Sequence, residues 1–296
     1  MNRKCGYVAV VGRPNVGKST LINHILGQKL NITSRKPQTT RHNLLGIKTH
    51  EDCQAIYVDT PGMHHDQKKA INRVMNRSAE SVIHDVDVIV FVLEKLRWTE
   101  EDDRVLAKLQ HTKSPVILVI NKIDQVANKD SLLPFLEMLS AKRNFEEIIP
   151  LSAKTGDSVQ YLERLIKQRL PESEHFFDQD QLTDKSERFL AAEIIREKLM
   201  RQLGNEIPYE VTVDIEQFKN IDGISHIDAL ILVERDSQKS IVIGDKGKKI
   251  KLIGTEARKD IEMLLGRKVM LKTWVKVKQG WSDDDKALQS LGFNDS

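Results

Sequence analysis

Residues 12–19 read Gly-Arg-Pro-Asn-Val-Gly-Lys-Ser, which is a glycine, four further residues and then Gly-Lys-Ser. The apolar run Tyr7–Val11 predicts a strand before this octapeptide, and Thr20–Leu26 predicts a helix after it. The two glycines let the backbone curl so that successive N–H groups point inward, and the start of the helix adds a partial positive charge. The octapeptide therefore predicts a phosphate-binding loop between a strand and a helix. By itself it does not distinguish ATP from GTP.

This loop supplies most of the predicted nucleotide contacts. Lys18 is expected to meet the outer phosphates, which makes it a candidate catalytic residue, and the Ser19 hydroxyl is expected to hold Mg²⁺. The residues predicted to bind nucleotide here are Gly12, Arg13, Pro14, Asn15, Val16, Gly17, Lys18, Ser19 and Thr20.

The first 170 residues alternate between short apolar segments and amphipathic segments. This alternation predicts βαβ units, hence an α/β domain with a mostly parallel sheet and helices on both of its faces. Ligands of such sheets bind at the carboxyl ends of the strands. The predicted strands are Tyr7–Val11, Ala55–Val58, Val86–Leu93, Val116–Ile120 and Ile148–Leu151.

Polar groups follow the second of these strands in the tetrapeptide Asp59, Thr60, Pro61 and Gly62. A carboxylate at a strand end can hold Mg²⁺, and the amide of Gly62 can bind a terminal phosphate because glycine permits close approach of the backbone. All four residues are predicted to bind nucleotide. Asp59 is also a predicted metal ligand.

The loop after the fourth predicted strand begins Asn121-Lys122-Ile123-Asp124. An aspartate accepts two hydrogen bonds from the N1–H and exocyclic amine of guanine, whereas adenine offers no such pair of donors. Asn121, Lys122 and Asp124 therefore predict selectivity for guanine. The shorter sequence Ser152-Ala153-Lys154 follows the next strand and is expected to buttress the guanine ring.

A polar segment, residues 37–41, lies between the first predicted helix and the second predicted strand. A threonine in this segment can give its hydroxyl to Mg²⁺ and its N–H to the γ-phosphate, which would make the segment a nucleotide-dependent switch. Thr40 is preferred over Thr39 as the metal ligand. The spacing does not decide between the two.

The polar stretch 171–185 interrupts the alternation and predicts a linker between a domain at 1–170 and a second domain at 186–296. A helix is predicted at Glu187–Leu203, with Gly204 as its stop, followed by strands near Tyr209–Phe218 and Ile227–Glu234. Another helix is predicted at Lys248–Leu265. A final strand at 268–278 alternates an apolar face with a cationic one, and an acidic tail ends the chain.

Two glycines three residues apart, Gly244 and Gly247, open the basic helix Lys248–Leu265. This is the GxxG pattern of KH domains, which clamps the backbone of about four nucleotides. The predicted element order, helix–strand–strand–helix–helix–strand, resembles a type II KH domain. Residues predicted to contact RNA are Ile243, Gly244, Asp245, Lys246, Gly247, Lys248, Lys249 and Ile250.

Composition agrees with a cytoplasmic nucleic-acid-binding protein. The formal net charge is only +3, but residues 241–280 hold eleven basic side chains against four acidic ones, a local net charge of +7. Cys5 and Cys53 are the only cysteines, which indicates a reducing compartment and no disulfide scaffold. The basic N-terminus is followed by a short strand and predicts no signal peptide, and no apolar run is long enough to span a bilayer.

Residues 7–170 resemble a translation-factor-class, Ras-like GTPase domain, and the whole chain resembles the Era family of GTPases with a C-terminal KH domain. The resemblance to the Era family rests on the octapeptide 12–19, the segments 37–42 and 186–198, and the loop 244–247. The resemblance implies Mg²⁺-dependent GTP hydrolysis and a role in assembling the small ribosomal subunit. It also implies binding to the 3′ end of the ribosomal RNA of that subunit and some peripheral contact with the cytoplasmic membrane. We expect a monomer.

One departure from Ras-like enzymes concerns catalysis. Met63 stands where those enzymes carry the glutamine that orients the attacking water, so slow intrinsic hydrolysis is implied. Glutamine-lacking GTPases with an asparagine at the position of Asn15 suggest a monovalent cation such as K⁺ there. The candidate catalytic residues are Asn15, Lys18, Thr40 and Gly62.

Two other functions compete with this prediction. One is a GTPase switch whose C-terminal domain docks a protein partner or an acidic membrane lipid. The other is a P-loop ATPase or kinase, which Asn121 and Asp124 disfavour.

Overall fold

The computed structural model describes residues 3–34, 36, 39–61, 70–203 and 210–291. Its N-terminal part is built on a six-stranded sheet in the order β2-β3-β1-β4-β5-β6, parallel except for the antiparallel β2. The predicted mostly parallel sheet is therefore confirmed. The strands are β1 (Lys4–Val11), β2 (Leu44–His50), β3 (Cys53–Asp59), β4 (Val88–Glu94), β5 (Val116–Asn121) and β6 (Glu147–Pro150).

Strand β2 is absent from the strands predicted from the sequence. Its sequence LLGIKTH has no sustained alternation, and its last residues are half-buried or exposed. As the edge strand of the sheet it pairs with β3 alone among the strands. An edge strand needs only part of a buried face, so its pattern is weak.

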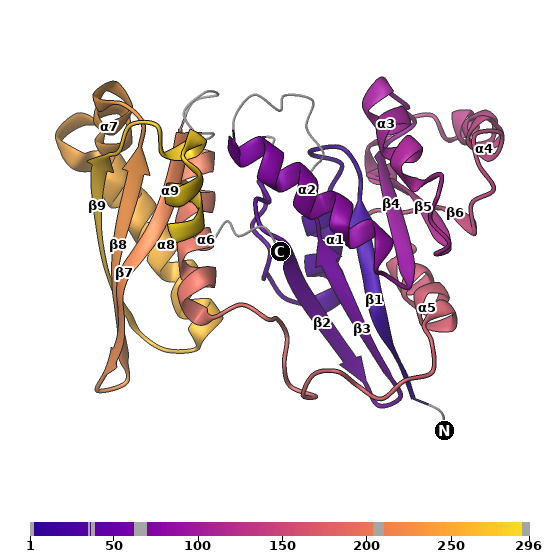
Figure 1. Ribbon diagram of the computed structural model, residues 1–296, viewed down its shortest axis with the longest axis horizontal. Coiled ribbons are helices and arrows are strands. Elements are labelled where there is room, and N and C mark those ends of the chain that lie inside the picture. The colour runs from indigo at the N-terminus through magenta and orange to yellow at the C-terminus, as the bar shows by residue number, and fades with distance from the viewer. Residues whose placement is uncertain (1–2, 35, 37–38, 62–69, 204–209, 292–296) are drawn as a thin grey trace.

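Helices cover both faces of this sheet, as the alternation predicts (Figure 1). One face carries α1 (Lys18–Leu26) and α5 (Val159–Arg169), whose apolar side chains pack on β1, β3, β4 and β5. The other face carries α2 (Ala70–His84), α3 (Glu100–Leu109) and α4 (Leu132–Ser140). Short 3₁₀ turns occur at Ile123–Gln125 and Lys129–Ser131.

Residues 171–185, the predicted linker, run along the edge of the sheet. The backbone N–H of Ile47 in β2 donates to the carbonyl of Leu182 at 2.8 Å. The buried side chain of Gln54 accepts from the backbone N–H groups of Phe176 and Phe177 at 2.9 and 3.0 Å. The segment is thus hydrogen-bonded to the N-terminal part along much of its length.

The C-terminal part confirms the predicted element order of a KH domain. It contains α6 (Glu187–Gln202), β7 (Val211–Ile221), β8 (Ile224–Val233), α7 (Asp236–Ile243), α8 (Lys248–Leu265) and β9 (Val269–Val277). The sheet order is β7-β8-β9, with β7 antiparallel and β9 parallel to β8. Gly204 and Tyr209, the predicted helix stop and strand start, lie outside the described residues.

The three helices α6, α7 and α8 bury one face of this sheet. Along β9 the residues alternate as predicted, with Val269, Leu271 and Val275 packed into the core. On the other face Met270 and Trp274 are 48% and 37% exposed. Local alternation therefore fixes which face of the strand meets the helices.

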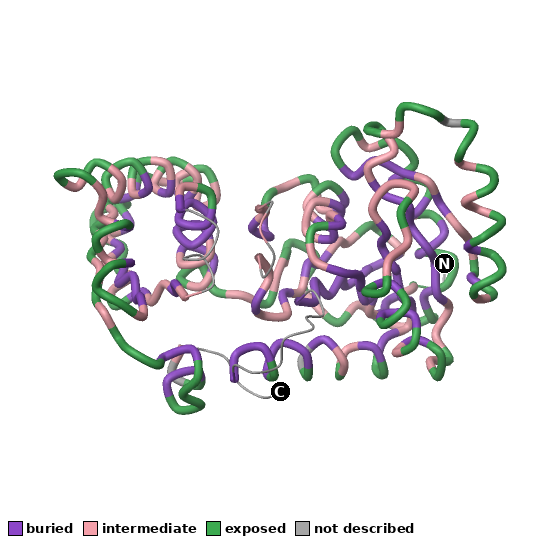
Figure 2. The backbone as a smooth tube through the Cα atoms, turned by 90° about the horizontal axis from the view of Figure 1, so that it is seen from above, coloured by how far each residue is buried: buried purple, intermediate pink, exposed green. Residues whose placement is uncertain are grey.

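The predicted acidic tail includes ordered structure. A 3₁₀ turn (Trp281–Asp283) and helix α9 (Asp285–Ser290) lead back to the N-terminal part. Trp281 and Leu288 pack against Ile71 and Val74 of α2 in a buried cluster, and Figures 1 and 2 show this segment beside the first turn of α2. The end of the chain therefore joins the KH part to α2. Residues 292–296 lie outside the description.

Two expectations from composition concern thiols and membrane spans. Cys5 and Cys53 are both buried and unbonded to each other, on the neighbouring strands β1 and β3. Burial raises the pKa of both thiols. Within the described ranges, no helix has the length and apolar character needed to cross a membrane.

Candidate functional site

The predicted phosphate loop, residues 12–19, lies between β1 and α1 at the carboxyl end of β1. Two of its positions require glycine, both because φ is positive there and because a Cβ atom would come too close to a neighbouring atom. Gly12 has a φ of 149°, and a Cβ there would lie 2.5 Å from the carbonyl oxygen of Val92. Gly17 has a φ of 103°, and its Cβ would lie 2.3 Å from the side-chain amide of Asn121. The loop is thus wedged against the ends of β4 and β5, with the N-terminus of α1 directed at any bound anion.

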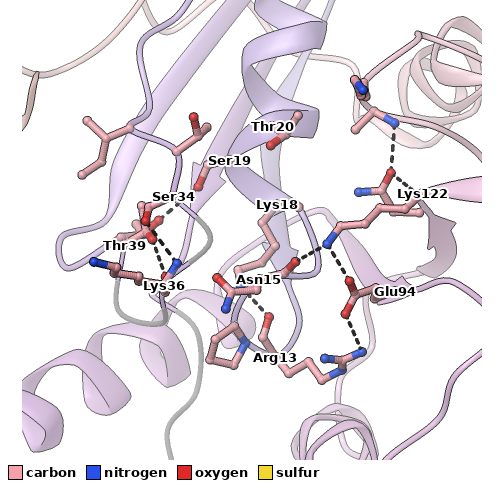
Figure 3. Close-up of a pocket in the computed structure, with 18 of the residues that line it drawn as sticks. Arg13, Asn15, Lys18, Ser19, Thr20, Ser34, Lys36, Thr39, Glu94 and Lys122 are labelled. Carbon is pink, nitrogen blue, oxygen red and sulfur yellow. Dashed lines mark hydrogen bonds and ion pairs between the residues drawn. The ribbon is translucent and has the colours of Figure 1, made fainter. Parts of the chain in front are cut away.

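Lys18 is the buried cation of this loop. Its Nζ donates to the carbonyl of Gly12 at 2.9 Å and to that of Arg13 at 3.1 Å. Figure 3 shows Lys18 and Arg13 in the cleft. Burial lowers the pKa of Lys18 to about 8, although the carboxylate of Asp59 acts in the opposite direction. Among the described residues the hydrogen-bond partners of Lys18 are these two carbonyls. A buried ammonium held in this way is suited to receive a phosphate, which would restore its ordinary protonation.

Three oxygen-bearing side chains meet beside Lys18. The Ser19 hydroxyl donates to Asp59 Oδ2 at 2.8 Å and lies 3.1 Å from the hydroxyl of Thr40. Thr40 in turn donates to Asp59 Oδ2 at 3.2 Å. Asn31 also donates to this carboxylate. Thr39 points elsewhere, because its hydroxyl donates to the carbonyl of Lys36 at 2.7 Å.

The chemistry of this group fits a hard divalent cation. Asp59 is fully buried, and burial raises its pKa against the opposing charge of Lys18. Its Oδ1 atom has no hydrogen-bond partner among the described residues. A buried carboxylate oxygen without a donor, next to two hydroxyls, is the donor set that Mg²⁺ prefers. Of the neighbouring residues, Thr60 donates to the carbonyl of Val10 and Pro61 is buried, while Gly62 lies outside the described residues.

The predicted guanine loop lies next to the phosphate loop. Asn121 joins the two, because its Nδ2 donates to the carbonyl of Val16 at 2.8 Å and its Oδ1 accepts from the N–H of Ala153 at 2.9 Å. The Asn121 side chain is therefore engaged by protein, and it positions the site. Asp124 Oδ1 accepts from the Ser152 hydroxyl at 2.7 Å.

A single cleft of about 1350 Å³ connects these groups, which makes it large enough for a nucleotide. Asn15, Lys18, Asp124 and Lys154 all line it. The structure therefore brings the predicted phosphate and base residues to one place, although they come from three separate loops.

Sequence reasoning missed Glu94, the last residue of β4. Its Oε1 pairs with Lys122 Nζ at 2.7 Å and its Oε2 with Arg13 Nη2 at 3.2 Å, so it bridges the base loop and the phosphate loop (Figure 3). Burial opposes ionisation of Glu94, but these cations outweigh it and lower its pKa. The sequence did hold a signal for Glu94, since it is the polar residue directly after the predicted strand Val86–Leu93.

The predicted RNA loop joins α7 to α8. Gly244 and Gly247 have φ values of 72° and 77°, and a Cβ on Gly244 would lie 2.6 Å from Cβ of Lys249. Asp245 and Lys246 are exposed. Asp245 pairs with Lys248 at 2.9 Å, in an ion pair at the surface. The loop thus exposes its backbone at the start of a helix, as a clamp on a phosphate chain requires.

Comparison with known proteins finds a GTPase family in the N-terminal part of the chain and a KH family in the C-terminal part. Residues 7–122 match the family model described as 50S ribosome-binding GTPase, and residues 206–282 match that of the KH domain. The GTPase Era proteins of Ectopseudomonas mendocina (strain ymp) and Pseudomonas aeruginosa (strain LESB58) are 62% and 61% identical to this chain over 292 residues. These matches cover 99% of this chain and 98% and 96% of the two relatives.

Two solved structures superpose on nearly the whole chain. One is an Aquifex aeolicus Era variant bound to GDP and AlF₄⁻, and the other is an Era in complex with MgGDPNP and nucleotides 1506–1542 of 16S ribosomal RNA. Each has a TM-score of 0.95 and 38% identity and covers 98% of this chain and 99% of its own.

The fold and the cleft define a P-loop GTPase carrying a C-terminal KH domain. With more than 60% identity over almost its entire length, the chain belongs to the Era family of GTPases.

Proposed function

We propose that this chain binds and slowly hydrolyses GTP in the cleft, and that its KH domain binds the 3′ end of small-subunit ribosomal RNA during assembly of that subunit. The observation that carries the nucleotide part is that Lys18, Ser19 and Asp124 line one cleft. The buried carboxylate of Asp59 is hydrogen-bonded to Ser19 at its wall. The RNA part is supported by the exposed GxxG loop. An Era at 38% identity holds MgGDPNP and a 16S fragment together.

In this proposal the loop 12–19 and Lys18 bind the phosphates, and the amide of Gly62 binds the terminal one. Mg²⁺, when bound, neutralises phosphate charge. Ser19, Thr40 and Asp59 would hold it, since their oxygens already lie within 3.2 Å of one another. Ser152, Ala153 and Lys154 support the base beside Asp124.

Replacing Asp124 by asparagine is expected to weaken GTP binding by about 2–4 kcal/mol and to shift preference toward xanthine nucleotides. The amide would present a donor to the N1–H of guanine in place of an acceptor. Titration with fluorescent GTP and XTP measures the change. Asp157→Asn, in the neighbouring loop, is the matched control because its side chain accepts from the Thr155 hydroxyl and Asp157 does not line the cleft. Unchanged GTP affinity in Asp124→Asn would refute this role.

The hydrolysis step is proposed to be slow and K⁺-dependent. Met63, outside the described residues, has an apolar side chain that cannot orient water. Asn15 lines the cleft within the phosphate loop, with a φ of 66°, and its side-chain oxygen could serve there as a ligand for K⁺.

We therefore expect faster GTP hydrolysis in K⁺ than in Na⁺, with the difference removed by Asn15→Ala. Phosphate release in matched chloride salts measures both rates. Asn144→Ala, on an exposed loop away from the cleft, should retain the difference. Equal rates in the two salts for the unmodified protein would eliminate the cation site.

The RNA clamp is tested by Lys246→Asp, which leaves two adjacent aspartates at the tip of the GxxG loop. Both side chains are exposed, so the fold should persist while phosphate is repelled. Binding to the 3′ segment of the ribosomal RNA should weaken, and the slope of log affinity against log salt should fall by about one. Lys113→Asp, an exposed residue of the GTPase part, makes the same charge change and should have little effect. Wild-type RNA affinity in Lys246→Asp would favour docking of a protein or membrane instead.

We further propose that the protein acts as a cytoplasmic monomer with peripheral contact to the inner membrane. Family membership supports this proposal. Sedimentation of the purified protein with and without anionic vesicles tests both parts.

A further inference from the structure

Helix α6 of the KH domain lies against the loop between α1 and β2 of the GTPase part, which carries Thr40 (Figure 1). Two α6 residues, Met200 and Arg201, line the nucleotide cleft itself. The wall of the cleft is therefore incomplete without the RNA-binding domain.

The first contact is made by Glu197, a fully buried carboxylate of α6. Its Oε1 accepts from the backbone N–H of Thr33 at 2.8 Å and from the Thr33 hydroxyl at 3.3 Å. Its Oε2 pairs with Lys29 at 2.5 Å. A buried carboxylate is stable only with such partners, and here they all come from the GTPase part or from α6.

The second contact lies one turn further along α6. Arg201 donates to the carbonyl of Thr33 at 3.1 Å and pairs with Glu197 Oε1 at 2.9 Å. The N–H and the C=O of Thr33 are thus both satisfied by one ion pair of the neighbouring domain. Side chains of α6 therefore hold the loop backbone at Thr33 through both of its polar groups.

The third contact involves Arg196, which is almost fully buried. It pairs with Glu193 at 2.6 Å and donates to the carbonyl of Thr39. This carbonyl belongs to the peptide that joins Thr39 to Thr40. Arg196 therefore fixes the peptide directly before the hydroxyl that lies 3.2 Å from Asp59.

Packing alone does not account for these side chains. Apolar residues of similar volume would join two domains without the desolvation penalty of buried charges. Arg196 and the Glu197–Arg201 pair instead direct their polar atoms at the backbone of one loop, at Thr33 and Thr39.

We propose that Arg196 and the Glu197–Arg201 pair are positioning residues for the nucleotide reaction, holding this loop so that Thr40 faces the metal and the terminal phosphate. The inference rests on the proposed function of Thr40. It makes the KH domain a determinant of GTP affinity. GDP lacks the phosphate that Thr40 would meet, so its affinity should depend much less on α6.

The test compares affinities for GDPNP and GDP in the full chain carrying Arg201→Ala or Arg196→Ala. Each variant should weaken GDPNP binding by about tenfold and raise the Mg²⁺ concentration needed for half-maximal GDPNP binding, with GDP affinity changed less than about twofold. Arg188→Ala is the matched control, since this α6 arginine donates to the carbonyl of Ile215 inside the KH domain.

Thermal melts accompany each titration. Arg201 is 45% exposed, and without it Glu197 keeps Lys29, Lys198 and the N–H of Thr33 as partners. Arg201→Ala is therefore expected to fold, and it decides the outcome if Arg196→Ala proves unstable. Equal weakening of GDPNP and GDP, or no change in either, overturns the positioning role. Failure of the unmodified protein to bind GDP would instead refute the proposed nucleotide function.

Discussion

Replacing Lys18 by methionine is expected to abolish GTP binding and to remove part of the pH dependence of stability of the nucleotide-free protein. Binding should fall at least about 100-fold, because a charge-assisted contact to the phosphates is lost. The stability effect follows from the buried position of Lys18, whose pKa falls from 10.5 to about 8 in the folded chain.

The sign of this effect follows from proton binding. Between pH 8 and 10 the unfolded chain keeps its proton on Lys18 while the folded chain loses it. The free energy of unfolding therefore rises with pH in this window, by up to about 3 kcal/mol from this group. Below pH 8 the folded protein bears the cost of a buried charge, which a bound phosphate would offset.

Urea unfolding at several pH values between 7.5 and 10 measures this dependence in the wild type and in Lys18→Met. Subtracting the two curves cancels the contributions of Cys5, Cys53 and Tyr57, whose raised pKa values oppose the trend at the alkaline end. Lys113→Met controls for loss of an exposed lysine. Parallel curves for the wild type and Lys18→Met would contradict the depressed pKa.

Replacing Trp281 by alanine is expected to cost about 3–5 kcal/mol of stability and to release the C-terminal segment from α2. Trp281 is fully buried among Ala70, Ile71 and Val74 of α2, and its indole N–H donates to the carbonyl of Glu210 at 3.3 Å. Asp283 in the same turn accepts from the N–H of Ala70 at 2.8 Å, so it caps the start of α2. Loss of the anchor should therefore expose this amide as well.

Urea unfolding followed by circular dichroism gives the stability, and hydrogen exchange at Ala70 reports the docking. Trp274→Ala is the matched control, because Trp274 is 37% exposed on the open face of the KH sheet and should cost less than about 1 kcal/mol. Since Ala70 is the first residue of α2, the docking joins the KH domain to this helix of the GTPase part. Unchanged exchange at Ala70 in Trp281→Ala would refute the anchor.

The amino-acid sequence by itself predicted the features that depend on residues close together in the chain. The spacing of Gly12, Gly17 and Lys18 predicted the loop between β1 and α1, because a phosphate-binding loop needs glycine at both of these positions. Periodicity predicted α8 at its observed bounds and the alternation along β9. In each case the information lies within about twenty residues of chain.

Tertiary structure alone decided how distant segments meet. Strand β2 gave no pattern because an edge strand buries only part of one face. The buried Glu197 reads in sequence as a solvated helical residue, and its partner Thr33 lies 164 residues away. Trp281 and Ala70 lie more than 200 residues apart in the chain, yet they pack in one buried apolar cluster. Such contacts depend on the relative placement of two folded parts, and the period of a helix or strand carries no information about that placement.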